Sequence, residues 1–91
     1  MLTLFRRSIP PARYELVTRG GCHLCDEMAA VLDEVLPSCG LSYVARDVDA
    51  EPELRERFSD VVPVLLRDGR PVAKVRVDRA ALTRIVRGRR E

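Results

Sequence analysis

The sequence predicts a small α/β domain in which helices cover both faces of a four-stranded mixed sheet. Residues 13–48 show the pattern strand, helix, strand, which requires a parallel strand pair with a right-handed crossover. Residues 61–77 show two strands around the turn signal Asp68-Gly69, which predicts an antiparallel hairpin. With 91 residues, of which 46% are hydrophobic and 33% charged, the chain is long enough for one modest core.

The first half of the chain should build the βαβ unit. Residues 13–18 are the first expected strand, and Gly20-Gly21 lets the backbone turn tightly after it. From Cys22 onward, apolar residues recur at helical spacing, which predicts an amphipathic helix. We expect Pro37 and Gly40 to end this helix.

The middle of the chain is expected to form a second strand at residues 41–48 and then a short helix. Asp49 is positioned to cap that helix, and Pro52 suits its first turn. Leu54 and Phe58 would form its buried face.

The last part of the chain should form the hairpin and a final helix. The third expected strand, residues 61–66, is interrupted by Pro63, because proline has no N–H to donate within a sheet. Residues 72–77 are the returning strand, and Asp78 is positioned to cap the last helix. The buried face of that helix should consist of Leu82, Ile85 and Val86.

Composition and charge narrow the classes of function. The net charge of +2, from 16 basic and 14 acidic residues, is too balanced to indicate a nucleic-acid partner. The apolar runs are too short to cross a membrane, and the first residues lack the apolar core of a secretory signal. We therefore expect a cytoplasmic protein with no membrane partner. We also expect it to be a monomer. Residues 1–12 would be an N-terminal extension and residues 13–91 the domain.

The motif Cys22-His23-Leu24-Cys25 stands at the predicted junction of strand and helix. Residues three apart on a helix share a face, so the two sulfurs can form a local disulfide. A helix N-terminus offers unpaired N–H groups and the positive end of the dipole, and both lower the pKa of a thiol there. In the cytosol, such a motif in a βαβ context indicates a redox dithiol.

The residues alone leave two other uses of these cysteines open. The pair can be a packing feature, because free cysteine often behaves as a small hydrophobe. A structural zinc site takes four ligands, and this chain has three cysteines and one histidine, so we assign no metal ligand within it. A metal or cluster shared between two chains remains an alternative.

The chain combines three motifs: Arg19-Gly20-Gly21-Cys22-His23-Leu24-Cys25-Asp26, Asp47-Val48-Asp49 and Val62-Pro63-Val64-Leu65. In this combination the chain resembles the glutaredoxin-like family of small bacterial proteins, within the thioredoxin-fold superfamily, and the resemblance covers residues 13–86.

The resemblance implies a thioredoxin-like fold of the glutaredoxin type. In that fold the first cysteine is the exposed attacking thiol and the second is the resolving thiol, roles that would belong to Cys22 and Cys25. The proline before the third strand is cis in the family and lies against the dithiol, which would place Pro63 at the site. The backbone of Val62 would then hold an extended substrate segment through strand-like hydrogen bonds.

Glutaredoxins are reduced by glutathione, and this sequence matches only part of their pattern for binding it. Arg19 matches a basic position that pairs with glutathione, and Asp78 resembles the acidic residues before the last helix. Residues 74–77, however, replace the family's Gly-Gly. His23 and Val62 stand where glutaredoxins commonly have proline and threonine. We therefore expect no bound cofactor, with glutathione a doubtful reductant.

Two further residues have open roles. His23 can favour the Cys22 thiolate through its charge or a hydrogen bond, or it is an exposed residue without a strong role. Cys39 follows the helix and should lie about 20 Å from the dithiol, at 1.5 Å of rise per residue. We expect it to be an inert, packed thiol.

The residues and the resemblance together predict a thiol–disulfide oxidoreductase or electron carrier. The Cys22 thiolate would attack a disulfide of a protein or small molecule, and Cys25 would release the product. A reductase or a partner dithiol would then reduce the pair again. The alternative is a binding module that holds an iron–sulfur cluster or metal across a dimer, or that docks partners without turnover. The expected substrate-binding residues are Arg19, His23, Val62, Pro63 and Asp78.

Overall fold

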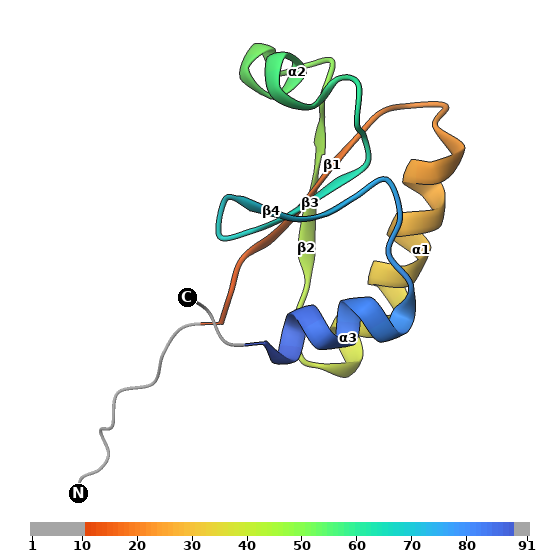
Figure 1. The fold of residues 1–91 in the computed structure, drawn as a ribbon, viewed down its shortest axis with the longest axis vertical. Coiled ribbons are helices and arrows are strands. Elements are labelled where there is room, and N and C mark those ends of the chain that lie inside the picture. Colours follow the sequence, from red (N-terminus) through yellow and green to blue (C-terminus); the bar gives the residue numbers. More distant parts are fainter. Residues whose placement is uncertain (1–10, 89–91) are drawn as a thin grey trace, which may run out of the picture.

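A computed structural model describes residues 11–88 of the chain. It contains a mixed sheet in the order β2-β1-β3-β4, with β1 and β2 parallel and the other pairs antiparallel. The element order confirms the predicted fold class (Figure 1). The elements are β1 (Tyr14–Thr18), α1 (His23–Ser38), β2 (Tyr43–Asp47), α2 (Pro52–Phe58), β3 (Val64–Arg67), β4 (Arg70–Lys74) and α3 (Arg79–Arg87).

Residues 1–10 and 89–91 lie outside the described part of the chain. The expected boundary between an extension at residues 1–12 and a domain at 13–91 therefore stays a prediction. Among the helices of residues 11–88, none is both long enough and apolar enough to cross a bilayer.

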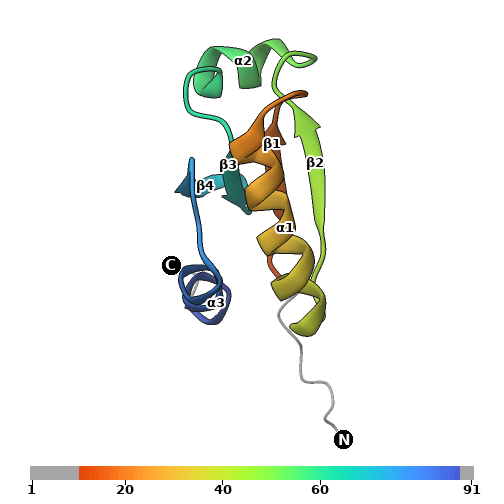
Figure 2. The same ribbon diagram turned by 90° about the vertical axis from the view of Figure 1, so that its right-hand side faces the viewer.

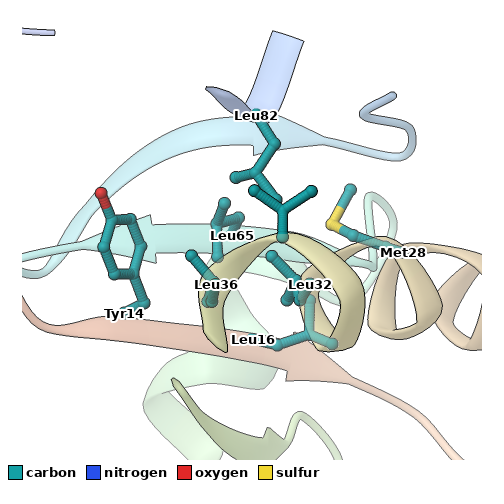
Figure 3. Packing of buried hydrophobic residues seen from close by; sticks show 8 residues of the cluster. Tyr14, Leu16, Met28, Leu32, Leu36, Leu65 and Leu82 are labelled. Atoms are coloured by element: carbon teal, nitrogen blue, oxygen red, sulfur yellow. The ribbon is translucent and has the colours of Figure 1, made fainter. Parts of the chain in front are cut away.

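Helices cover both faces of the sheet, and each face has its own apolar cluster. On one face, α1 and α3 pack over β1 and β3 (Figure 3). On the other face, Leu54 and Phe58 of α2 pack against the two central strands. Both ribbon views place α2 at one end of the sheet (Figures 1 and 2). The first cluster consists of Tyr14, Leu16, Met28, Leu32, Val35, Leu36, Leu65 and Leu82.

The helix α1 ends in a hydrogen-bonded turn around Gly40, as its sequence suggests. The N–H of Leu41 donates to Leu36 O and the N–H of Gly40 to Pro37 O, which is the Schellman arrangement. Gly40 has φ +73°, a conformation that glycine adopts at little cost. The expectation that Pro37 ends the helix was wrong, because Pro37 lies inside its last turn.

The hairpin confirms the turn signal but is shorter than expected. Asp68 and Gly69 both have positive φ, as a two-residue hairpin turn requires. The third strand begins at Val64 rather than residue 61, directly after the cis peptide bond between Val62 and Pro63. The fourth strand spans Arg70–Lys74 rather than residues 72–77. The strand ends at Lys74 because the backbone turns away from β3 at Val75, which has a positive φ.

The cap of α2 also differs from the expectation. Its N-cap is Glu51, not Asp49, and no side chain donates or accepts a capping hydrogen bond there. The Glu51 carboxylate instead binds the guanidinium of Arg46 on β2. Asp49 binds the guanidinium of Arg19 instead. Pro52 opens the helix as expected.

The edge strand β2 contains a tyrosine whose ionisation can be tested. The Tyr43 hydroxyl donates to Asp33 Oδ1 at 2.8 Å, and burial together with this carboxylate raises the pKa of Tyr43 from 10 to about 12. Because the folded state favours the neutral phenol, its stabilising contribution should be complete below pH 10. It should be lost as the pH rises from 10 to about 12. Spectroscopic titration of phenolate in wild type and Tyr43→Phe isolates this group, and ionisation near pH 10 would contradict the structure.

Candidate active site

Cys22 and Cys25 are joined by a disulfide at the start of α1. Their Cα atoms are 5.2 Å apart, within the usual range for a disulfide of about 4.4–6.8 Å. Cys22 is the N-cap residue of the helix, and its Sγ accepts the N–H of Cys25 at 3.1 Å. The Asp26 N–H donates to the Cys22 carbonyl at 3.1 Å. The helix N-terminus thus fixes both cysteines in one turn.

The two cysteine residues differ in exposure. Cys25 is 1% exposed, whereas Cys22 is half-buried. In the reduced protein, the helix dipole and the Cys25 N–H both favour negative charge on Cys22 Sγ. The arrangement therefore offers one accessible nucleophilic sulfur with a second sulfur shielded behind it.

A short loop turns the chain from β1 into this helix. Gly21 has φ +72°, in the left-handed region that residues with a Cβ rarely adopt. A glycine at this position therefore allows the tight turn that places Cys22 at the helix start.

Pro63 lies at the same end of the sheet. The Val62–Pro63 peptide bond is cis, and Pro63 is fully buried. Val64, the first residue of β3, pairs with Val17 near the end of β1, from which the chain leads to Cys22. In Figure 1 the α2–β3 connection and the loop that enters α1 lie at this end. The carbonyl of Pro63 accepts the N–H of Val75 at 2.7 Å, which ties the β4–α3 connection to it.

Arg19 connects three loops around the site. Its guanidinium binds both carboxylate oxygens of Asp49, at 2.8 and 3.0 Å. It also donates to the Ser59 carbonyl at 3.1 Å and to Ser59 Oγ at 2.8 Å. The hydrogen bonds with Arg19 hold the pKa of Asp49 below its ordinary value. Four of the five N–H groups of Arg19 are thus already used within the protein.

The other predicted binding residues also have partners in the protein. His23 Nε2 lies 2.8 Å from the Glu27 carboxylate, one turn along α1, and both side chains are exposed. Asp78 is the N-cap of α3 as predicted, and its Oδ1 accepts the Ala81 N–H at 2.7 Å. Neither residue has a described contact with the sulfur atoms of the disulfide.

A groove of about 430 Å³ lies between α1 and the β4–α3 connection. It begins at Leu24, which stands between the two cysteines in sequence, and continues along α1 toward the start of α3. Most of its lining is apolar. The lining residues are Leu24, Glu27, Met28, Val31, Val75, Arg76, Val77, Asp78 and Ala81.

Cys39 lies after the last turn of α1, at the opposite end of the helix from the dithiol. The prediction of a packed thiol was wrong, because Cys39 is exposed. Cys39 is the C-cap residue of α1 and lies inside the Schellman turn between Leu36 and Leu41. Within residues 11–88, no three His, Cys, Asp or Glu side chains cluster as a metal ion would require.

Replacing Cys39 with alanine is expected to leave disulfide reduction unchanged. The 16-residue helix α1 separates it from the dithiol by about 24 Å at 1.5 Å per residue. Steady-state turnover of a model disulfide by wild type and Cys39→Ala tests this directly. A large loss of turnover in a folded variant would show that a third thiol takes part.

The model of the glutaredoxin-like domain (DUF836) matches residues 13–87 of the chain. The chain belongs to this family. Relatives of the glutaredoxin-like protein include the uncharacterized protein Rv0508 of Mycobacterium tuberculosis and the uncharacterized protein Mb0520 of Mycobacterium bovis. Each is 39% identical over 69 residues, which cover 70% of this chain and 71% of the relative.

Two solved structures resemble the glutaredoxin-like protein in fold. Protein Ne2328 from Nitrosomonas europaea has a TM-score of 0.73 at 23% identity, covering 88% of this chain and 96% of its own. The oxidised thioredoxin from Plasmodium falciparum has a TM-score of 0.57 at 18% identity, covering 82% and 77%. These neighbours confirm the predicted thioredoxin-like fold.

Sequence reasoning missed three features of the site. It did not find Ser59 or Asp49 as partners of Arg19, nor Glu27 as the partner of His23, nor Val75 as the residue that contacts Pro63. The sequence contained a usable signal for two of these features, the Arg19–Asp49 pair and the His23–Glu27 pair. Arg19 and Asp49 follow the ends of neighbouring parallel strands, which meet at one edge of a sheet. His23 and Glu27 have the i, i+4 spacing of a helical ion pair.

Proposed function

We propose that this glutaredoxin-like protein is a thiol–disulfide oxidoreductase that cycles between a Cys22–Cys25 dithiol and disulfide. In its reduced form the Cys22 thiolate attacks one sulfur of a substrate disulfide. A Cys22–substrate disulfide forms, the substrate S–S bond breaks, and the leaving thiolate takes a proton from water. Cys25 then loses its proton and attacks Cys22 Sγ, which releases the second substrate thiol. Two electrons pass from the protein to the substrate.

The observation that supports this proposal is the unequal exposure of two cysteine residues that are joined by a disulfide. Cys22 is accessible at the N-cap of α1, and Cys25 is shielded one turn behind it. Only Cys22 can be approached by a bulky disulfide, and only Cys25 is positioned to resolve the product.

The surroundings suggest how a substrate segment is held. Val62 is partly exposed next to the buried Pro63, at the end of the sheet where the dithiol lies. An extended segment of the substrate would hydrogen-bond to the Val62 backbone as an added strand. We propose a monomer that works in the cytoplasm, where a dithiol partner or a flavoenzyme reductase restores the thiols.

The test is reduction of a model disulfide by the purified protein in the presence of excess small dithiol. Wild type should accelerate the reaction, and the Cys22→Ser, Cys25→Ser double variant should not. A wild-type protein that carries iron or another metal, and that shows no turnover, would favour the cluster-binding alternative instead.

Glutathione is expected to reduce the oxidised protein poorly. Asp49 and Ser59 use four of the five N–H groups of Arg19, and Asp78 caps the N–H of Ala81, so these two residues have little donor capacity left for a carboxylate of glutathione. Losing one charge-assisted anchor weakens binding by about 1.5–3 kcal/mol, roughly ten- to hundredfold.

Paired coupled assays measure this preference on one disulfide substrate. One assay is driven by glutathione with its reductase, and the other by a thioredoxin-reductase-like flavoenzyme or a partner dithiol. Faster turnover with glutathione at physiological concentration would contradict the expectation. Asp49→Asn, which removes the charge that neutralises Arg19, should raise the glutathione rate if Arg19 is what limits it.

A further inference from the structure

The loop that leads from β1 to Cys22 has little packing of its own. Gly20 and Gly21 stand between Arg19 and Cys22, and both glycines are exposed. A Cβ atom added at either glycine would meet no heavy atom within 4 Å beyond its neighbours in the chain. Because glycine also has the greatest backbone freedom, these two positions do not by themselves fix where Cys22 lies.

Arg19 anchors this loop from its other end. Its guanidinium forms a bidentate ion pair with Asp49 and donates to the carbonyl and the hydroxyl of Ser59. Ser59 is the C-cap of α2, where free carbonyl groups and the negative end of the helix dipole favour a cation. Within the described part of the chain, the two hydrogen bonds to Ser59 are the only ones that join residues 19–22 to residues 59–62.

The two segments that Arg19 links both belong to the candidate active site. The last paired residues of β1 and β3 at this end of the sheet are Val17 and Val64. Beyond that pair, β1 leads into the loop that carries the attacking sulfur. Residues 59–62 lead into β3 and include Val62, whose backbone would hold a substrate segment. The position of Arg19 therefore governs how these two parts of the site lie relative to each other.

We infer that Arg19 is a positioning residue, which sets the place of Cys22 relative to the Val62 backbone and does not itself bind the substrate. The inference rests on the proposed function. The planar guanidinium suits this role because it directs donors to two loops at once, which the ammonium of lysine cannot reproduce. A polypeptide disulfide that contacts both Cys22 and Val62 depends on this link, whereas a small disulfide that contacts only Cys22 does not.

The kinetic test compares two such disulfides in single-turnover reduction by the reduced protein. One is a peptide linked through its single cysteine to a reporter thiol, and the other is hydroxyethyl disulfide, which is too small to reach Val62. Arg19→Met removes every donor and keeps an aliphatic stem. It should lower the maximal rate for the peptide roughly ten- to hundredfold, as a misplacement of about 1 Å can do. The half-saturating peptide concentration and the rate with the small disulfide should stay nearly unchanged.

The half-saturating concentration separates positioning from binding. If Arg19 held the substrate directly, Arg19→Met would raise this concentration and leave the maximal rate nearly unchanged. That result would overturn the inference.

Further variants separate position from charge. Asp49 neutralises Arg19 in the wild type, so Arg19→Met leaves a negative charge unpaired, whereas the double variant Arg19→Met, Asp49→Asn keeps the net charge of the pair. Arg19→Lys keeps the positive charge but cannot reproduce the four hydrogen bonds. A positioning role predicts the same loss of peptide rate in all three variants. Recovery of the wild-type rate in the double variant and in Arg19→Lys would show that charge is what matters, and would overturn the inference.

Arg46→Met is the matched control for general effects on the fold. The side chain of Arg46 is 33% exposed, against 32% for Arg19, and it also binds two partners, Glu15 and Glu51. Its hydrogen bonds all go to these two carboxylates and not to the loop before Cys22. Arg46→Met should therefore keep the peptide rate. An equal loss in Arg46→Met and Arg19→Met would mean that loosening of the fold explains both.

Backbone order parameters from NMR relaxation test the link without the redox step. In the disulfide form of Arg19→Met, the values for Gly20 and Gly21 should fall toward the value of about 0.6 that marks flexible backbone. In Arg46→Met they should match wild type. If wild type reduces neither disulfide, the proposed function and the inference fail together. If wild type reduces both, and Arg19→Met reduces the peptide at the same rate with unchanged order parameters, the inference alone fails.

Discussion

Replacing Cys22 with serine is expected to abolish disulfide reduction, with a rate loss of at least about a thousandfold. The hydroxyl of serine is a far weaker nucleophile than a thiolate and cannot form a disulfide with the substrate. Cys22 is also the sulfur that a substrate can approach, since Cys25 is 1% exposed. Steady-state reduction of a model disulfide gives the rate.

Cys25→Ser should behave differently, because the first attack does not need Cys25. The Cys22–substrate disulfide should form and then persist, and intact-mass measurement should show one substrate thiol added per protein. The same variant in a cell extract would retain physiological substrates for identification. Equal, full activity of both single variants would contradict the assignment of attacking and resolving roles.

Replacing Leu65 with alanine is expected to destabilise the domain by about 2–5 kcal/mol. Leu65 is fully buried on β3 between α1 and α3, where its neighbours in Figure 3 come from three other elements. A domain of this size has a total stability of about 5–14 kcal/mol, so the loss is a large fraction of it. Urea denaturation of the disulfide form measures the change in the free energy of unfolding.

Val44→Ala is the control for this substitution. Val44 lies on the edge strand β2 with 61% of its surface exposed, so its loss should change the free energy of unfolding by no more than about 0.5 kcal/mol. If the two variants shifted the urea midpoint equally, Leu65 would not be the core residue that the structure shows.

The sequence predicted the parts of the fold that depend on local pattern. The helical spacing of apolar residues located α1, and Asp68-Gly69 located the hairpin, because φ > 0 at both positions is a local property of the turn. Asp78 was recognisable as a cap from its position before a periodic run. Each of these features depends on residues that are close together in the sequence.

The features that the sequence did not predict depend on contacts between segments that are far apart in the chain. The backbone preferences of valine do not predict a positive φ at Val75. The residue adopts this conformation while its N–H donates a hydrogen bond to the carbonyl of Pro63. Arg19 finds its partners 30 and 40 residues further along the chain. Resemblance suggested a ligand role for Arg19, whereas only the folded chain shows the carboxylate and hydroxyl that occupy it.

The pairing of β1 with β3 has a consequence for how the protein is made. The two strands are about 50 residues apart in the chain, yet they lie side by side at the centre of the sheet. A ribosome adding about 5–20 residues per second completes Cys22 and Cys25 several seconds before β3. Throughout that interval β1 lacks its antiparallel partner, so the centre of the sheet can form only after β3 has been synthesised.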